Sequence, residues 1–180
     1  FYNDTWEFDG VQWQQRSFAI DAPLPSPREG ARMIYDRARQ RMVLFGGRNG
    51  TTYYRDLWEF DGAQWQLINA NVAATAARAL FGMVYDSLNA RAVFVGGRNG
   101  ATTFGDTGFF SAGAFAPSGI AGFRGRRESS AVYDSARQRL VIFGGDSGGV
   151  FPLQDQWEFN GTSWARVAPA SMPSARADHS

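Results

Sequence analysis

The chain has 180 residues, of which 44% are apolar, and its formal net charge is +1. These values predict one globular domain with a real core, and they argue against nucleic acid as a main partner. The chain contains neither cysteine nor lysine, which excludes disulfides, thiolate metal sites, lysine Schiff bases and Walker-type phosphate loops.

The first complete group of strand signals lies between residues 31 and 67. Short apolar or alternating segments are separated there by turn residues, which is typical of antiparallel strands. The expected strands are 31–35, 41–45, 57–60 and 64–67. Asp61 and Gly62 stand between the last two strands, where a two-residue type I′ turn favours this dipeptide. No apolar run approaches the roughly 18 residues of a membrane-spanning helix.

The same signals recur along the chain with a period near 50 residues. One set of equivalent segments begins 52, 50 and 49 residues apart, at 4–13, 56–65, 106–115 and 155–164. A second set runs from Tyr-Asp to Gly-Gly, at 35–47, 85–97 and 133–145. An arginine stands seven residues before each of these tyrosines, at Arg28, Arg78 and Arg126, and Arg176 begins a further unit. Internal repetition of this kind predicts a stack of similar supersecondary units.

A repeat of this length, with a glycine doublet and spaced tryptophans, resembles the kelch repeat, which is one blade of a β-propeller. The resemblance covers essentially the whole chain. It implies an all-β, kelch-type β-propeller of four-stranded antiparallel blades, present here as a partial ring of about three and a half blades. The expected parts are a half blade at 1–15, blades at 28–67, 78–116 and 126–167, and the start of an unfinished blade at 176–180.

The recurring residues have structural interpretations. The glycine doublets are expected at positive φ or at close approaches between neighbouring blades. The tryptophan pairs, such as Trp58 and Trp65, are expected to pack between blades. The three recurring arginines are interpreted as structural, with hydrogen bonds across blades near the channel. The aspartates of the first turn in each unit are expected to cap that turn and to form ion pairs, at Asp36–Arg41, Asp86–Arg91 and Asp134–Arg139.

The second unit departs from this pattern. Gly108 stands where the other units have their first tryptophan, and Phe115 stands where they have their second. We therefore expect this blade to pack differently and to have a weaker outer edge.

The string Gly-Asp-Ser-Gly-Gly at 145–149 resembles the segment around the nucleophilic serine of trypsin-like proteases. A nucleophilic serine needs a positioned base, and the one histidine of the chain is His179, downstream of Ser147. The string also falls where the other units carry Arg48-Asn49-Gly50 and Arg98-Asn99-Gly100. We interpret it as turn chemistry and expect no catalytic residue. One histidine and no cysteine likewise argue against zinc or copper sites, so no metal or cofactor is expected.

The resemblance places the loops between second and third strands, and those between blades, on one face around a central channel. Arginine and aromatic residues on such loops are the types enriched at binding hot spots. The candidate binding residues are Arg48, Tyr53, Tyr54, Arg98, Phe104, Asp146 and Phe151. A solvated loop residue is the alternative interpretation of each, and the equivalent Arg48 and Arg98 also suit a role in capping loop carbonyls.

The predicted function is a non-catalytic scaffold that presents these loops to a protein or glycan partner. One alternative is a segment of a secreted carbohydrate-active propeller enzyme whose catalytic residues lie outside this chain. Another is a structural repeat subunit of a surface assembly, and the ring is expected to close by self-association or by continuation of the chain. The bias toward arginine favours a bacterial source, and we expect an extracytoplasmic or secreted protein. Asn3, Asn49 and Asn160 match the glycosylation sequon, although turns are sufficient to explain two of them.

Overall fold

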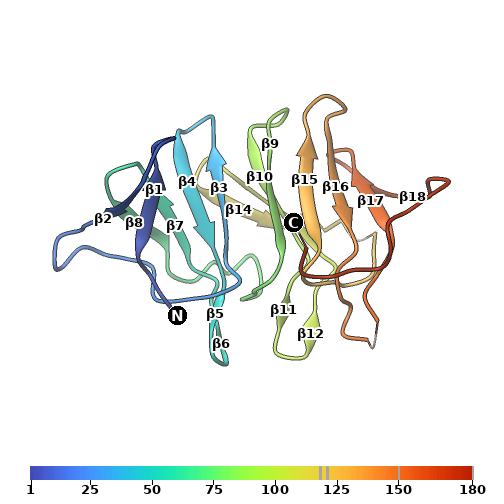
Figure 1. Ribbon diagram of the computed structural model, residues 1–180, viewed down its shortest axis with the longest axis horizontal. Helices are drawn as coiled ribbons and strands as arrows, with labels where there is room; N and C mark the ends of the chain where they lie inside the picture. The colour runs from blue at the N-terminus through green and yellow to red at the C-terminus, as the bar shows by residue number, and fades with distance from the viewer. Residues whose placement is uncertain (118, 121, 150, 180) are drawn as a thin grey trace.

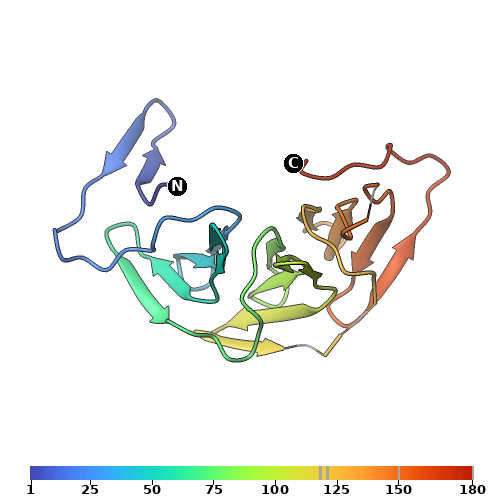
Figure 2. The ribbon, with the colours of Figure 1, turned by 90° about the horizontal axis from the view of Figure 1, so that it is seen from below.

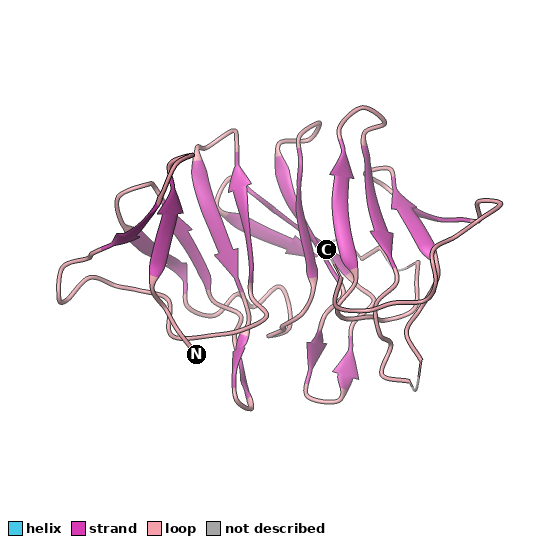
Figure 3. Cartoon of the chain, in the orientation of Figure 1, coloured by secondary structure: helices cyan, strands magenta, loops and turns pink. Residues whose placement is uncertain are grey.

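The computed structural model describes residues 1–117, 119–120, 122–149 and 151–179. All regular structure in this part of the chain is β-structure, and no helix long and apolar enough to cross a membrane occurs in it. Figure 3 shows strands joined by turns and loops. Ser180, the last residue of the unit expected to begin at Arg176, lies outside the described residues, as do positions 118, 121 and 150 within the expected loops.

Three four-stranded antiparallel sheets make up most of the protein, each with its strands in chain order. Sheet I contains β3 (Arg32–Asp36), β4 (Arg41–Phe45), β7 (Leu57–Phe60) and β8 (Trp65–Asn69). Sheet II contains β9 (Gly82–Asp86), β10 (Arg91–Val95), β13 (Thr107–Ser111) and β14 (Ala114–Pro117). Sheet III contains β15 (Ser130–Asp134), β16 (Arg139–Phe143), β17 (Gln156–Phe159) and β18 (Trp164–Val167). The four strands expected in the first unit match the strands of sheet I, and their ends differ by at most two residues.

Three smaller hairpins accompany the sheets. The N-terminal hairpin pairs β1 (Thr5–Phe8) with β2 (Trp13–Arg16). Two hairpins lie in the loops expected between second and third strands, and they pair β5 (Arg48–Asn49) with β6 (Thr52–Tyr53) and β11 (Arg98–Asn99) with β12 (Thr102–Thr103). Figures 1 and 2 show the sheets side by side along a curved row, with the N-terminal hairpin at one end.

Two of the three hydrophobic clusters lie between neighbouring sheets. Val43 and Phe45 of β4 are fully buried against residues of sheet II, including Met83 and Phe94. A second cluster joins sheets II and III, and a third surrounds the buried Trp58 and Trp65 of sheet I. Because each sheet buries one face against the next, the repeat gains a continuous core only when the units stack.

Two tryptophans connect neighbouring units by hydrogen bonds as well as by packing. The indole N–H of Trp65 donates to the hydroxyl of Thr5 in the N-terminal hairpin, at 2.9 Å. The indole N–H of Trp164 donates to the hydroxyl of Thr107 in sheet II, at 2.8 Å. The expectation that these tryptophans pack between units is confirmed at both places.

The glycine doublets mark close contacts of the main chain between units. Gly46 and Gly47 have φ values of 65° and 96°, which side-chain-bearing residues rarely adopt. A Cβ at Gly46 would lie 2.6 Å from the carbonyl oxygen of Arg78, and the amide of Gly47 donates to that same oxygen at 2.8 Å. Both expected reasons for the doublet, positive φ and close approach, are therefore confirmed here.

The recurring arginines are buried, and their side chains bind within their own unit. Arg126 forms a bidentate pair with Asp155, with Nη1–Oδ1 and Nη2–Oδ2 distances of 2.7 and 2.9 Å. It also donates to the carbonyl of Gly144. Arg28 and Arg78 clasp their own aspartates in the same way. The expectation of side-chain hydrogen bonds across units is wrong. The main chain makes that connection, because the amide of Arg126 donates to the carbonyl of Phe104.

In two of the three sheets, the aspartate of the first turn forms its ion pair with a different arginine from the one expected. Asp36 does cap its turn, since its carboxylate accepts from the amides of residues 38 and 39. Its ion-pair partner is Arg39 rather than Arg41, and in sheet III the partner of Asp134 is Arg137 rather than Arg139. The arginine inside the turn reaches both this aspartate and a glutamate on the third strand, so it displaces the cross-strand arginine.

Sheet II keeps the expected pair because its turn residue is uncharged. Asn89 stands where the other sheets have the turn arginine, and its amide donates to the carboxylate of Asp86 at 2.7 Å. Arg91 then supplies the positive charge, at 3.2 Å from the same carboxylate. The prediction for this unit is confirmed.

Candidate functional site

In all three sheets, the loop that follows the second strand projects from the same edge of the sheet. In sheets I and II these loops are the hairpins β5–β6 and β11–β12, which extend from the lower edge in Figure 1. The corresponding loop of sheet III begins at Asp146, whose carboxylate accepts a hydrogen bond from the amide of Gly148 at 2.6 Å. We call these three segments together the loop face.

Each loop is attached by one isolated antiparallel bridge near its start. The bridges join Glu29 to Arg48, Ala79 to Arg98, and Arg127 to Asp146. The first bridge carries an ion pair of 2.7 Å, and the third carries an ion pair with the charges exchanged between the two positions. The middle bridge has an alanine in place of a charged residue, so Arg98 has no ion-pair partner at its own bridge.

Arg98 binds instead to the neighbouring loop. Its Nε donates to the phenol oxygen of Tyr53 at 3.1 Å. Burial raises the pKa of that phenol, but the guanidinium groups of Arg48 and Arg98 outweigh the burial and bring the pKa below its ordinary value. The two arginines therefore hold Tyr53 between the first and second loops.

The third loop continues this arrangement of charges. Burial raises the pKa of Asp146, whereas the amide of Gly148 and the guanidinium groups of Arg127 and Arg98 lower it, with a net decrease. Arg98 thus contributes to the lowered pKa of both Tyr53 and Asp146. Four of the seven candidate residues, Arg48, Tyr53, Arg98 and Asp146, form one row across three loops, which we call the polar row.

The other three candidates lie in different surroundings. The Tyr54 ring lies under the guanidinium of Arg28, at 4.4 Å, and the Phe104 ring lies under that of Arg78, at 4.5 Å. Both rings therefore cover structural arginines. Phe151 is strongly exposed on the third loop, and no aromatic contact ties it to the polar row within the described residues.

Two members of this face were missed by the sequence analysis. Glu29 and Arg127 pair with Arg48 and Asp146, and each directly follows one of the recurring structural arginines. The signal was present in the repeat, because equivalent positions carry opposite charges in the first unit and exchanged charges in the third. Recognising it requires knowing that these positions are bridged.

Ser147 and His179 contact different parts of the structure. Ser147 accepts a hydrogen bond through its carbonyl from the hydroxyl of Thr103, at 3.5 Å. The His179 ring packs edge-on against Phe143, with 5.7 Å between ring centroids, and its nitrogens have no hydrogen-bond partner among the described residues. The described residues contain no group of three or more histidine, aspartate or glutamate side chains placed to hold a metal ion.

The chain was also compared with known protein families and with curated proteins. No family model and no curated protein matches it. The geometry of the loop face and the internal repeat therefore carry the functional proposal.

Proposed function

We propose that the three four-stranded sheets are blades of a kelch-type β-propeller that acts as a non-catalytic binding scaffold. The period near 50 residues, the antiparallel four-stranded sheets and their curved arrangement support this architecture. The loop face presents its residues to a protein or glycan partner. Binding residues on loops that a rigid scaffold positions are a common arrangement in proteins.

The polar row is the observation that carries this proposal. The Arg98 side chain has Tyr53 as its one hydrogen-bond partner in the described part of the chain, through Nε. Its two terminal nitrogens can then donate to a carboxylate, a backbone carbonyl or sugar hydroxyls of a partner. Because the hydrogen bond to Tyr53 already restricts this side chain, binding costs less conformational entropy than it would for a free arginine.

Removal of the Arg98 guanidinium tests the proposal. The probes are an array of immobilised glycans and a displayed peptide library, each incubated with the wild type and with Arg98→Ala. The matched control is Arg37→Ala, which removes an exposed arginine from a first turn, away from the loop face. We expect ligands selected by the wild type to bind Arg98→Ala at least about tenfold more weakly and Arg37→Ala unchanged. Equal binding by all three proteins would refute a role for the polar row.

A further inference from the structure

Asp106, which ends the loop that carries the β11–β12 hairpin, has fewer hydrogen-bond donors around it than its equivalents. Asp56 in sheet I and Asp155 in sheet III each pair with an arginine. Each also accepts the indole N–H of the tryptophan two residues later, at 2.7 Å in both sheets. Arg78 holds Asp106 in the same bidentate way. The indole donor is missing, because Gly108 stands where the other sheets have that tryptophan.

Asp106 is also much more exposed than its equivalents. Its side chain is 50% exposed, whereas those of Asp56 and Asp155 are 14% and 18% exposed. Phe94 occupies the place of the missing indole ring, but a phenyl group has no N–H to donate. Within the described residues, Arg78 is the one hydrogen-bond partner of the Asp106 carboxylate, so acceptor sites on this carboxylate remain available.

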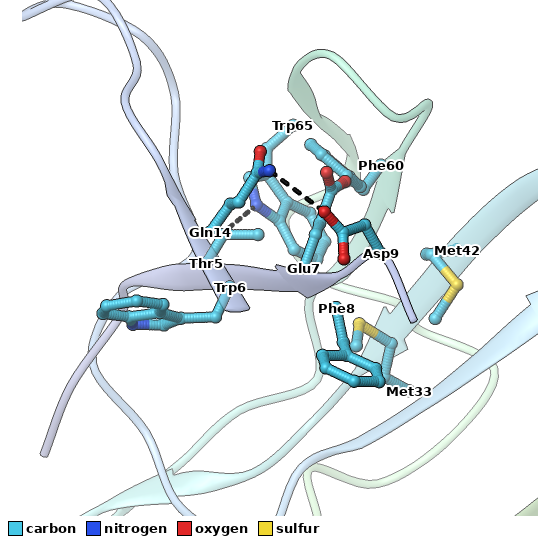
Figure 4. A pocket seen from close by; sticks show the side chains of 10 residues that line it. All are labelled: Thr5, Trp6, Glu7, Phe8, Asp9, Gln14, Met33, Met42, Phe60 and Trp65. Atoms are coloured by element: carbon cyan, nitrogen blue, oxygen red, sulfur yellow. Dashed lines mark hydrogen bonds between the residues drawn. The ribbon is translucent and has the colours of Figure 1, made fainter. Parts of the chain in front are cut away.

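The loss of the second tryptophan from sheet II is compensated, in contrast to the loss of the first. In sheet I the indole of Trp65 donates to the hydroxyl of Thr5, as Figure 4 shows. In sheet II the equivalent of Trp65 is Phe115, and it packs against the cluster that contains Leu57, the equivalent of Thr5. Neither of these residues needs a hydrogen bond from its side chain. Asp106 has no such apolar replacement: the arginine clasp explains why the carboxylate is kept, but it leaves acceptor sites exposed.

The loop that ends at Asp106 also offers donors. Arg98 uses its Nε for Tyr53, and its two terminal nitrogens have no hydrogen-bond partner in the described part of the chain. The loop is closed at its base, because the amide of Gly96 donates to the carbonyl of Asp106 at 3.1 Å. One loop with a fixed main chain therefore presents both a strong donor and a carboxylate acceptor.

The charges around this loop favour an uncharged ligand. Arg78 already neutralises the Asp106 carboxylate, and the donors to the equivalent aspartates are uncharged indole groups. Asp146, whose pKa the guanidinium of Arg98 helps to lower, opposes an anionic group beside that arginine. A hydroxyl group is uncharged and can both donate to a carboxylate and accept from a guanidinium.

We propose that the partner of the loop face is an uncharged glycan whose hydroxyl groups donate to Asp106 and accept from the terminal nitrogens of Arg98. Neighbouring hydroxyls on a sugar ring have a fixed spacing, so they bind with a smaller loss of conformational entropy than flexible side chains do. This inference rests on the proposed function, because it takes the loop face as the binding surface. It adds Asp106 to the binding residues and names the chemistry of the ligand.

The test gives Asp106 the donor that it lacks. The double variant Phe94→Leu with Gly108→Trp reproduces the residue pair of sheet I, so its indole N–H should donate to Asp106. The matched control, Phe94→Leu with Gly108→Phe, adds a ring without an N–H. Both variants and the wild type are incubated with an array of immobilised neutral glycans. We expect the tryptophan variant to bind the glycans selected by the wild type at least about tenfold more weakly, and the control to bind them within about threefold of the wild type. Unchanged binding by the tryptophan variant, or equal weakening in both variants, would overturn the proposal.

A second measurement uses the wild type, so it does not depend on the stability of any variant. The protein is labelled with ¹³C at its aspartate carboxyl carbons and titrated with the neutral oligosaccharide that binds most tightly on the array. We expect the carboxyl resonance of Asp106 to shift, and those of Asp56 and Asp155 to stay in place. An Asp106 resonance that does not move at saturation would contradict the proposal.

The inference and the proposed function fail in different ways. If the wild type selects displayed peptides but no neutral glycan, the scaffold function stands and the glycan inference is wrong. The same holds if Arg98→Ala weakens glycan binding while the tryptophan variant does not. If neither glycans nor peptides bind the wild type, or if Arg98→Ala binds them equally well, the proposed function itself is wrong.

Discussion

A glycine and a phenylalanine in sheet II replace a tryptophan and an aliphatic residue of the other sheets. Phe94 lies opposite Gly108, where sheet I pairs Leu44 with Trp58. Sheet III has the same arrangement as sheet I, with an isoleucine opposite its tryptophan. A Cβ built at Gly108 would overlap the Phe94 ring, so the ring occupies the space of the missing indole. We predict that the double replacement Phe94→Leu with Gly108→Trp costs less stability than the sum of the two single replacements.

The expected free energies follow from the size of the groups. Phe94 is fully buried, and Phe94→Leu removes three carbons, which costs about 2 kcal/mol at about 0.8 kcal/mol per buried carbon. Gly108→Trp alone forces an indole into the Phe94 ring and should cost about 3 kcal/mol, the upper end for overpacking. If the two effects were independent, the double variant would lose about 5 kcal/mol. We expect it to lose less than about 2 kcal/mol, which gives a coupling of about 3 kcal/mol.

Urea denaturation of the four proteins, followed by far-UV circular dichroism, measures this coupling. The reverse exchange in sheet I, Leu44→Phe with Trp58→Gly, is a matched control, because it should convert that sheet to the sheet II arrangement with a coupling of the same sign. Additive losses in the sheet II cycle, within about 0.5 kcal/mol, would refute compensation between the two residues.

The remaining predictions concern the buried arginine clasp. Arg126→Met should lower the free energy of unfolding by about 3–5 kcal/mol, because it leaves the Asp155 carboxylate without its partner, whereas the exposed Arg166→Met should change it by less than about 0.5 kcal/mol in the same urea titration. Burial raises the pKa of Asp155, but hydrogen bonds from Arg126 and Trp157 lower it to a net value below the ordinary one. This carboxylate therefore stabilises the fold above its unfolded-state pKa of about 3.9, and the stabilisation is lost as the pH falls below that value. The difference in unfolding free energy between the wild type and Asp155→Asn should shrink between pH 5 and pH 3, and a constant difference would contradict this assignment.

Local patterns were sufficient to predict the strands of the four-stranded sheets, although not those of the loop hairpins β5–β6 and β11–β12. Asp61-Gly62 marks a turn, but the expected two-residue type I′ turn is wrong: Phe60 pairs with Trp65, so the connection has four residues, and Gly62 but not Asp61 has a positive φ. The Asp61 carboxylate accepts from the amides of residues 63 and 64 instead. The apolar run before Gly46 marks a buried strand. Three repetitions of each signal removed the ambiguity that a single short strand leaves. The same reasoning identified the glycine doublet as a close approach between units.

Side-chain partners were harder to predict than strands. Asp36 has Arg37, Arg39 and Arg41 within five residues, and spacing alone does not say which of them also reaches Glu59. The polar row was only partly predictable for the same reason. The ion pairs that hold Arg48 and Asp146 join residues about 20 positions apart through isolated bridges, and the Arg98–Tyr53 hydrogen bond joins two different loops. None of these positions belongs to a strand that the sequence indicates.

Differences among the three units are compensated in the core. Thr5 and Thr107 each accept a hydrogen bond from a tryptophan of the next unit. The equivalent of these threonines in sheet I is Leu57, and Phe115, which cannot donate, packs against the cluster that contains it. At this position of each interface, a threonine thus faces a hydrogen-bonding tryptophan, or a leucine faces an apolar phenylalanine.

The loop face departs from this rule at one position. Two of its bridges carry a complete ion pair, with the charges exchanged between them, but Ala79 leaves Arg98 without a carboxylate at its own bridge. Ala79 is fully buried, so a packed methyl group stands where the first unit has an acid. Under the proposed function, the terminal nitrogens of Arg98, whose Nε already donates to Tyr53, would bind an acceptor group of the partner.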